Sequence, residues 1–373
     1  MAGRNPFVYD DPLPPEDLVD REDESAQLFE LAEGGHNTRL QAPRRYGKTT
    51  LLGKVQADSE KAGMGTVYVD FYRALTLAEV SRRIEEAYLK ALAGPARRAV
   101  AAVSRRWHGQ IVAKPGGVGA EAEPASQSEQ QRLSDMLDLP KSVFSKAGTR
   151  TLVVFDEFQD LLRIDSDVDG LLRSKIQFHR DEASYIFAGS EPGMLSELFG
   201  NRDRPLFEQA RPIDLGPLGD DDLAEYIGER FERSKRDPGE ALDELLTLVR
   251  GHPQRAMLAA HHLWEQTPAE ETADAETFTR VLEALDRDTR ERFERTWELM
   301  ADKPNQRKVL AALASSDDTL YSTRTLQRFG LEKGSAETAA TALVGRGEIQ
   351  RGERSGYLII DPLLERWLRL TQT

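Results

Sequence analysis

Residues 41–50 read Gln41-Ala42-Pro43-Arg44-Arg45-Tyr46-Gly47-Lys48-Thr49-Thr50 and follow a short apolar run. Directly after them, Leu51, Leu52 and Val55 lie at helical spacing, which predicts a helix that begins inside this segment. The segment matches the pattern G-x-x-x-x-G-K-[ST] at every fixed position except the first, where Ala42 stands in place of glycine. A loop of this kind wraps backbone N–H groups around a polyphosphate, and the dipole of the following helix favours the anion. The segment therefore predicts a phosphate-binding loop (P-loop), preceded by a strand.

The fixed residues of this loop have separate roles. Gly47 lets the backbone turn tightly where a Cβ atom would intrude on a phosphate. Lys48 is expected to reach the β- and γ-phosphates, and Thr49 is expected to offer its hydroxyl to Mg²⁺. The other nucleotide contacts are predicted to come from Ala42, Pro43, Arg44, Arg45, Tyr46 and Thr50. A basic surface turn that merely caps a helix is the alternative interpretation of one imperfect motif.

A second motif favours the nucleotide interpretation. Residues 151–155 form a continuous apolar run that ends in Asp156 and Glu157, as expected of a strand buried in a parallel sheet. Open α/β sheets bind ligands at the carboxyl ends of their strands. Asp156 is therefore predicted to hold Mg²⁺, and Glu157 to polarise the water that attacks the γ-phosphate. Ser190 ends a later strand and is a candidate to bond the γ-phosphate or the attacking water, although a simple turn residue would also suit that position.

Composition limits the class of protein. The chain has 373 residues, which is enough for two or three domains. No apolar run approaches the ~20 residues of a membrane helix, and the N-terminus lacks the apolar region of a signal peptide. The absence of cysteine excludes disulfides, thiolate metal sites and thiol catalysis. These features predict a cytoplasmic protein that does not associate with membranes. The net charge of −14 argues against non-specific coating of nucleic acid and still allows a local basic face.

Strands and helices alternate up to about residue 218, which predicts an α/β fold with a mainly parallel sheet. The proline-rich and acidic residues 1–20 are expected to run extended over the surface. A hairpin is predicted at about 110–121, a polar loop at 123–130 and a single helix at 129–146. From Asp220 onward the pattern is helical. Three helices after residue 303, followed by a predicted hairpin, describe a winged helix, and residues 303–373 carry a net charge of about +3 whereas the remainder carries about −17.

With these motifs in hand, the sequence resembles the archaeal-type ATPase family, within the AAA+ and STAND P-loop ATPases that also include origin-recognition-type initiators. The likeness covers nearly the whole chain. Apart from the P-loop, it is carried by Asn5-Pro6-Phe7, Val19-Asp20-Arg21-Glu22, Phe155-Asp156-Glu157-Phe158, Ala188-Gly189-Ser190, Leu215-Gly216-Pro217-Leu218, Gly251-His252-Pro253 and Asp361-Pro362-Leu363-Leu364-Glu365-Arg366-Trp367.

The resemblance implies a P-loop ATPase core with a five-stranded sheet (residues 1–218), a helical lid (219–302) and a C-terminal winged helix (303–373). It places the adenine near Val19 and Arg21 and beneath the lid turn at Pro253, and it gives Ser190 a sensor role. Arg255 is the candidate lid arginine that reports the state of the nucleotide. A salt bridge on a helix face is the alternative for Arg255.

One departure from the family bears on the reaction rate. Relatives often carry Tyr-Gly-Arg before the last strand, where this chain has Phe207-Glu208-Gln209. The expected position of the arginine finger is therefore Gln209, and Arg204 and Arg211 are candidate substitutes, unless the finger comes from elsewhere. Because an arginine finger is worth about 10³–10⁵ in rate, its loss predicts slow turnover.

These features predict an ATPase that binds ATP, ADP and Mg²⁺ and acts as a nucleotide-controlled switch for a DNA or protein partner. One alternative is a DNA-binding protein whose ATP is structural and never turned over. Another is a protein-interaction ATPase, with a protein partner or a homo-oligomer as its target. Residues 335–344 are small and weakly charged, and they lack the Arg, Asn and Gln side chains that usually read base edges.

Overall fold

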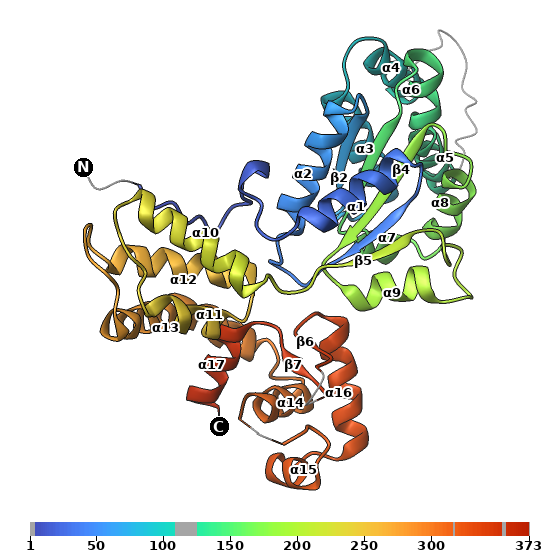
Figure 1. Cartoon of the computed structure of the whole chain (residues 1–373). Coiled ribbons are helices and arrows are strands. Elements are labelled where there is room, and N and C mark those ends of the chain that lie inside the picture. The colour runs from blue at the N-terminus through green and yellow to red at the C-terminus, as the bar shows by residue number, and fades with distance from the viewer. Residues whose placement is uncertain (1–3, 109–124, 316–317, 353–355, 373) are drawn as a thin grey trace, which may run out of the picture.

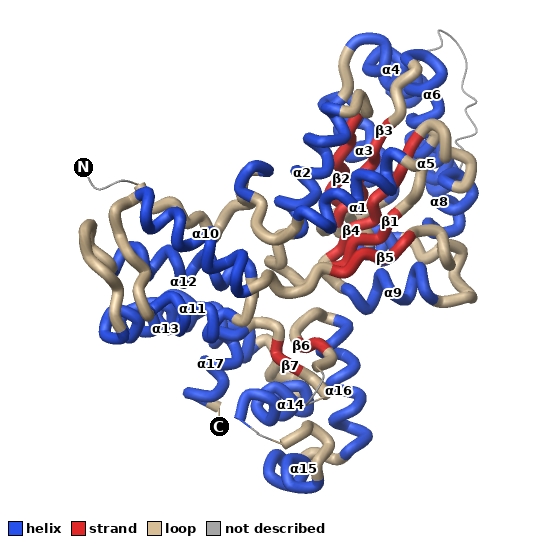
Figure 2. Tube along the Cα trace, viewed as in Figure 1, coloured by secondary structure: helices blue, strands red, loops and turns tan. Residues whose placement is uncertain are grey.

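The computed structural model describes residues 4–108, 125–315, 318–352 and 356–372. Its N-terminal part is built on a five-stranded parallel sheet with the strand order β2-β3-β4-β1-β5 (Figure 2). The strands are β1 (Thr38–Gln41), β2 (Gly65–Asp70), β3 (Thr151–Asp156), β4 (Ala183–Gly189) and β5 (Arg211–Asp214). The predicted α/β fold with a five-stranded sheet is thereby confirmed.

Helices cover both faces of this sheet (Figure 1). Along β3, Leu152 and Val154 pack toward α1 (Glu22–Glu33) and α2 (Lys48–Lys61). Val153 and Phe155 belong to the core on the opposite face. That core is covered by α3 (Leu77–Ala91), α4 (Gly94–His108), α5 (Ala125–Leu137), α6 (Leu139–Ala147), α7 (Gln159–Ile164), α8 (Val168–Ile176) and α9 (Pro192–Gly200). A strand buried on both faces explains the continuous apolar run before Asp156.

Three predictions for this part differ from the structure or lie outside it. The single helix expected at 129–146 is two helices, α5 and α6, because Pro140 near the start of α6 lacks the N–H that a continuous helix needs and its ring crowds the preceding turn. The loop expected at 123–130 is wrong from Ala125 onward, where α5 begins. The hairpin expected at 110–121 lies outside the described residues.

The N-terminal arm does not simply run over the surface, as the sequence suggested. Phe7 is only 1% exposed, and its ring lies 5.7 Å from that of Phe231. The Asn5 side-chain amide donates a hydrogen bond of 3.0 Å to the backbone carbonyl of His261. Burial of the aromatic ring therefore fixes the arm on α10 (Asp220–Arg233) and α12 (Pro253–Gln266) before the short 3₁₀ helix at Pro15–Asp17 reaches α2.

Helices α10, α11 (Ala241–Val249), α12 and α13 (Ala275–Glu298) follow the sheet, as the helical pattern predicted. No described helix combines the length and the apolar character needed to cross a bilayer.

The C-terminal residues form α14 (Pro304–Ser315), α15 (Thr323–Phe329), α16 (Lys333–Gly345) and the antiparallel strands β6 (Ile349–Gln350) and β7 (Leu358–Ile359). Three helices followed by two strands is the element order of a winged helix, and that interpretation stays a prediction. The end of α16 packs closely on α9, since a Cβ atom on Gly193 would lie 3.0 Å from the Cα atom of Gly345.

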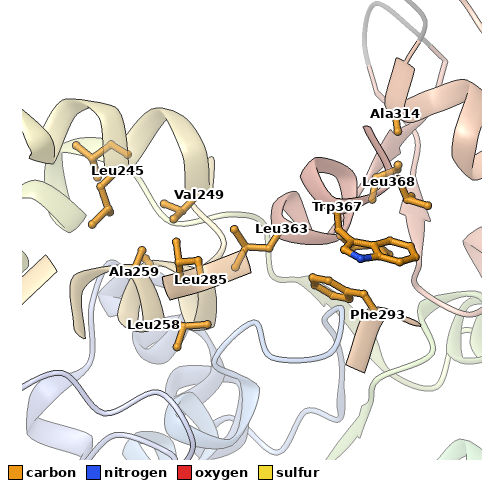
Figure 3. Close-up of a cluster of buried hydrophobic side chains, with 14 of the residues drawn as sticks. Leu245, Val249, Leu258, Ala259, Leu285, Phe293, Ala314, Leu363, Trp367 and Leu368 are labelled. Atoms are coloured by element: carbon orange, nitrogen blue, oxygen red, sulfur yellow. The ribbon is translucent and has the colours of Figure 1, made fainter. Parts of the chain in front are cut away.

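A final helix, α17 (Pro362–Thr371), was not predicted, and it packs against α14 and also against α13 and α11. In Figure 3, Leu363 lies on the side of α17 that faces Val249 and Leu285, which belong with it to one apolar cluster. Trp367 lies beside Phe293, with ring centroids 6.1 Å apart. The last residues of the chain are thus attached to the helices that precede α14.

Candidate functional site

A cavity of about 870 Å³ lies where the carboxyl ends of the strands face helices α12 and α13. The sheet side contributes residues 43–50 of the P-loop together with Asp156, Glu157 and Ser190. The helical side contributes residues of α12 and α13, and the N-terminal arm closes part of the rim. Side chains from segments more than 200 residues apart in the sequence therefore meet in this one cavity.

The P-loop has the backbone that its sequence requires. It leaves β1 after Gln41 and enters α2 at Lys48, with Gly47 as the N-cap residue at a φ of 80°. That left-handed conformation favours glycine. Ala42 is fully buried beneath the loop and does not line the cavity, whereas Pro43 to Thr50 do. The methyl group of Ala42, which stands in place of the first glycine, therefore packs in the core behind the loop and does not enter the cavity.

Lys48 joins the two predicted motifs. Its amine donates to Oδ1 of Asp156 and lies 3.3 Å from Oε1 of Glu157. The other oxygen of Asp156 accepts a hydrogen bond from the hydroxyl of Tyr68 on β2. Burial, followed by the charge of Asp156, raises the pKa of Tyr68, so the phenol stays protonated and keeps this carboxylate in place. Sequence reasoning missed Tyr68, because its role depends on β2 lying next to β3.

Glu157 lies at the tip of β3 with a positive φ of 49°. The hydroxyl of Ser190 donates to its Oε2 at 2.8 Å, and the side-chain amide of Gln159 donates to the same oxygen. The predicted sensor residue thus lies against the predicted water-polarising residue. Two donors fix one carboxylate oxygen, while the other faces Lys48.

The oxygen donors at this site fit magnesium bound together with phosphate. Thr49 is exposed at the start of α2, and Asp156 lies across from it on the cavity wall. Mg²⁺ is usually held by one or two carboxylates plus substrate phosphates. In the described part of the chain, no group of three or more His, Asp or Glu side chains is arranged to hold a metal ion by itself. The protein side of the site therefore supplies only part of a magnesium shell.

On the helical side, Pro253 and Arg255 line the cavity. Arg255 is only 1% exposed, and it forms a two-pronged ion pair with Asp361, in which Nε lies 2.9 Å from Oδ1. Asp361 also caps α17 by accepting from the backbone N–H groups of Leu363 and Leu364. The salt-bridge alternative for Arg255 is therefore present, and its partner lies in the C-terminal part of the chain.

Val19 and Arg21 also line the cavity, where the adenine was expected. The Arg21 guanidinium is buried; it donates to the carbonyl of Gly216 at 2.5 Å and pairs with Glu24 at 2.9 Å. Arg21 thus ties the arm to the connection between β5 and α10.

The two candidate finger arginines do not line this cavity. Arg204 lies 3.5 Å from Asp169 of α8. Arg211 is exposed at the amino end of β5, opposite Thr38, which is the end of the sheet away from the P-loop. Gln209, at the expected finger position, accepts a hydrogen bond from Arg173. The structure therefore brings together the P-loop, the strand tips and the lid residues but leaves these arginines outside.

Sequence reasoning missed three residues of α13 that line the cavity, namely Asp288, Thr289 and Arg292. Arg292 follows Asp288 by four residues and Thr289 by three, so both share a helix face with Arg292. In a helix as rich in charge as residues 275–298, that spacing alone does not mark a binding surface.

No protein-family model matches the chain, and no curated protein matches its sequence. Solved structures do share its fold. The Walker-type ATPase PABY2304 of Pyrococcus abyssi superposes with a TM-score of 0.71 at 18% identity, over 97% of this chain and 99% of that one. The ORC2 protein of Aeropyrum pernix, in its ADPNP–ADP complexes, superposes with a TM-score of 0.61 at 16% identity, over 98% and 96% of the two chains. The resemblance read from the motifs is thereby confirmed at the level of the fold, because the chain shares the fold of these two proteins.

Proposed function

We propose that this protein is an ATPase that binds ATP in the cavity and acts as a nucleotide-controlled switch. The observation that carries the proposal is the two-sided lining of the cavity, with the P-loop and strand tips on one side and α12 and α13 on the other. A ligand that contacts both sides binds the closed arrangement more tightly than an open one, which is the requirement for shifting a conformational equilibrium. The relative from Aeropyrum pernix was solved with adenine nucleotides.

The side chains suit this reaction. Lys48 and the N-terminus of α2 bind the phosphates. Thr49 and Asp156 hold Mg²⁺, which supplies neutralisation of charge on the phosphate oxygens. Glu157 orients the attacking water and accepts its proton. Ser190 and Gln159 fix the Glu157 carboxylate for that role.

Hydrolysis is proposed to be slow. The finger position is Gln209, and neither Arg204 nor Arg211 reaches the cavity of its own chain. The test is the ATPase rate of the wild type and of Glu157→Gln. A low but measurable wild-type rate should fall by about 10²–10⁴ in the variant, the range for loss of a general base. Equal rates at background in both proteins would overturn the hydrolytic proposal and leave a protein with structural ATP.

The partner of the switch is proposed to be DNA or another protein, reached through the C-terminal helices. On α16, the exposed side chains include Lys333, Glu337, Thr338 and Thr341, a set of small residues and mixed charge. This surface suits a protein partner better than direct reading of bases. A gel-shift assay with and without ATP, at several salt concentrations, distinguishes the two, because DNA binding weakens steeply with salt.

A further inference from the structure

Helix α4 is the one described helix whose neighbourhood in the sequence is purely basic over more than twenty residues. Residues 87–108 contain no Asp or Glu, although the chain holds 64 of them and has a net charge of −14. The helix carries four exposed arginines, Arg97, Arg98, Arg105 and Arg106. We call this set the arginine face, and its charge is opposite to that of the chain as a whole.

The arginine face occupies one side of α4. Arg98 and Arg105 are seven residues apart, so their side chains leave the helix within about 20° of each other. Arg97 and Arg106 lie about 90° to either side of this direction. On the opposite side, Ala96 and Val100 are buried in the apolar core that α4 helps to cover. Burial of that side therefore fixes the arginines toward solvent.

The protein does not neutralise this face with its own carboxylates. On the neighbouring helix α3, Glu86 pairs with Arg82, and Glu85 pairs with Arg132 of α5. Helix α6, which packs against α4, contains no Asp or Glu between its ends. Among the residues that the structure describes, none of the four arginines forms an ion pair. The arginine face therefore presents uncompensated positive charge to a partner.

We propose that the arginine face of α4 binds the phosphate backbone of double-stranded nucleic acid without reading its sequence. In Figure 1, α4 lies at the end of the molecule opposite to α14, α15 and α16, so this surface is separate from the C-terminal helices considered above. It is also separate from the cavity, because no residue of α4 lines it. The inference therefore does not depend on the binding of a nucleotide.

The spacing and type of the charges favour a duplex. The two arginine pairs are eight residues apart, which is about 12 Å along a helix. A duplex carries one charge per ~1.7 Å of its axis, so about seven phosphate charges face that length. A guanidinium offers a planar pair of donors to phosphate oxygens. Such backbone contacts position a protein and carry no sequence information.

An anionic membrane fits this face less well. Helices that bind at a membrane surface place an apolar side in the lipid. The apolar side of α4 is buried in the protein, and none of the described large apolar side chains of α4 is exposed. The arginines would therefore have no apolar anchor beside them.

The test is fluorescence anisotropy of a labelled 30-base-pair DNA duplex of random sequence, titrated with the full chain at 50–200 mM salt and without ATP. The variant is Arg98→Ala/Arg105→Ala. The matched control is Arg287→Ala/Arg290→Ala, which removes the same charge from exposed positions on α13, a helix of mixed charge. Circular dichroism verifies the fold of each protein.

Four phosphate contacts predict that the wild-type affinity falls about 150-fold between 50 and 200 mM salt, and two contacts predict a fall of about 12-fold. We expect the first value for the wild type and the control, and the second for Arg98→Ala/Arg105→Ala. Arg98→Lys/Arg105→Lys should keep the salt dependence of the wild type, because it keeps the charges.

Three results would overturn the inference. The folded wild type does not bind the duplex at 50 mM salt, or the Arg98→Ala/Arg105→Ala variant binds it with the affinity and salt dependence of the wild type. In the third, the wild type binds phosphatidylserine vesicles through Arg98 and Arg105 but does not bind the duplex, which would assign the arginine face to a membrane surface. None of these results bears on ATP binding, so the proposed nucleotide switch stands or falls separately.

Discussion

Replacing Asp361 with asparagine should weaken the attachment of α17 to α12, because Asp361 at the start of α17 pairs with Arg255 of α12. The carboxylate accepts from Arg255, whose side chain is 1% exposed, and it also caps α17 through Leu363 and Leu364. Asparagine is as good a cap as aspartate. The substitution therefore removes the charge that balances a buried guanidinium and keeps the cap.

The cost follows from that burial. Burial by itself would raise the pKa of Asp361, but Arg255, together with His252 and Arg292, offsets the effect of burial, and the pKa lies below its usual value. The carboxylate is therefore ionised at neutral pH. Removing one partner of a buried ion pair costs about 3–5 kcal/mol. The amide oxygen of asparagine still accepts one hydrogen bond from Arg255. We therefore expect the free energy of unfolding to fall by an amount at the lower end of this range, about 3 kcal/mol.

The assay is urea unfolding at pH 7 followed by tryptophan fluorescence, because Trp297 of α13 and Trp367 of α17 lie 6.1 Å apart. The matched control is Asp286→Asn. Asp286 pairs with Arg366 and joins α13 to α17, whereas the Arg255–Asp361 pair joins α12 to the start of α17. Both side chains of the Asp286–Arg366 pair are about one third exposed, at 32% and 31%. Loss of that pair should lower the free energy of unfolding by at most about 1 kcal/mol. Equal losses in the two variants would refute the argument from burial. Arg255→Met added to Asp361→Asn should recover most of the loss, since it removes the unpaired charge.

Two further predictions concern stability in acid and the packing of α16 on α9. His252 is buried, and burial, with repulsion from Arg255 and Arg45 against the attraction of Asp361, lowers its pKa to about 4. The unfolded chain takes up a proton near pH 6.5 and the folded chain does not, so stability should fall by up to about 3 kcal/mol between pH 6.5 and 4. His252→Asn keeps a cap on α12, and its urea midpoint of unfolding should change less with pH across that range than the wild-type midpoint does. The same dependence of the midpoint on pH in both proteins would contradict this prediction. Gly193→Leu should push α16 off α9, at about 1–3 kcal/mol, and enlarge the particle in small-angle scattering. Gly345→Ala is the control, since a Cβ atom there meets nothing within 4 Å, and equal radii for both variants would argue against the packing.

The phosphate loop and the acidic strand tip were predictable because each is a local pattern. Gly47, Lys48 and Thr49 are adjacent in the sequence, and the apolar run before Asp156 marks a buried strand by itself. Short helices were harder. The signals for α9 were Pro192 at its first position and the apolar residues after it, but a nine-residue helix gives few repeats to read.

Residues whose roles depend on long-range packing could not be predicted. The partner of Arg255 is Asp361, 106 positions later, and no local pattern links them. Arg292 is one of several charged residues on α13, and only the fold, which brings that helix to the cavity, shows that Arg292 belongs to the site. Tyr68 reaches Asp156 because β2 lies beside β3, and that strand order is a property of the whole sheet.

The central claim is that a magnesium–ATP complex binds between the P-loop and the helices α12 and α13. The most direct measurement is calorimetric titration of the full chain with ATP and magnesium, beside Lys48→Ala and the control Lys54→Ala. Lys54 lies on the same helix and, among the residues that the structure describes, pairs with Asp58. The account predicts that the wild type and Lys54→Ala bind ATP alike and that Lys48→Ala, with its fold verified by circular dichroism, binds at least about 10-fold more weakly. Binding that is undetectable in the folded wild type, or equally tight in all three proteins, would contradict it.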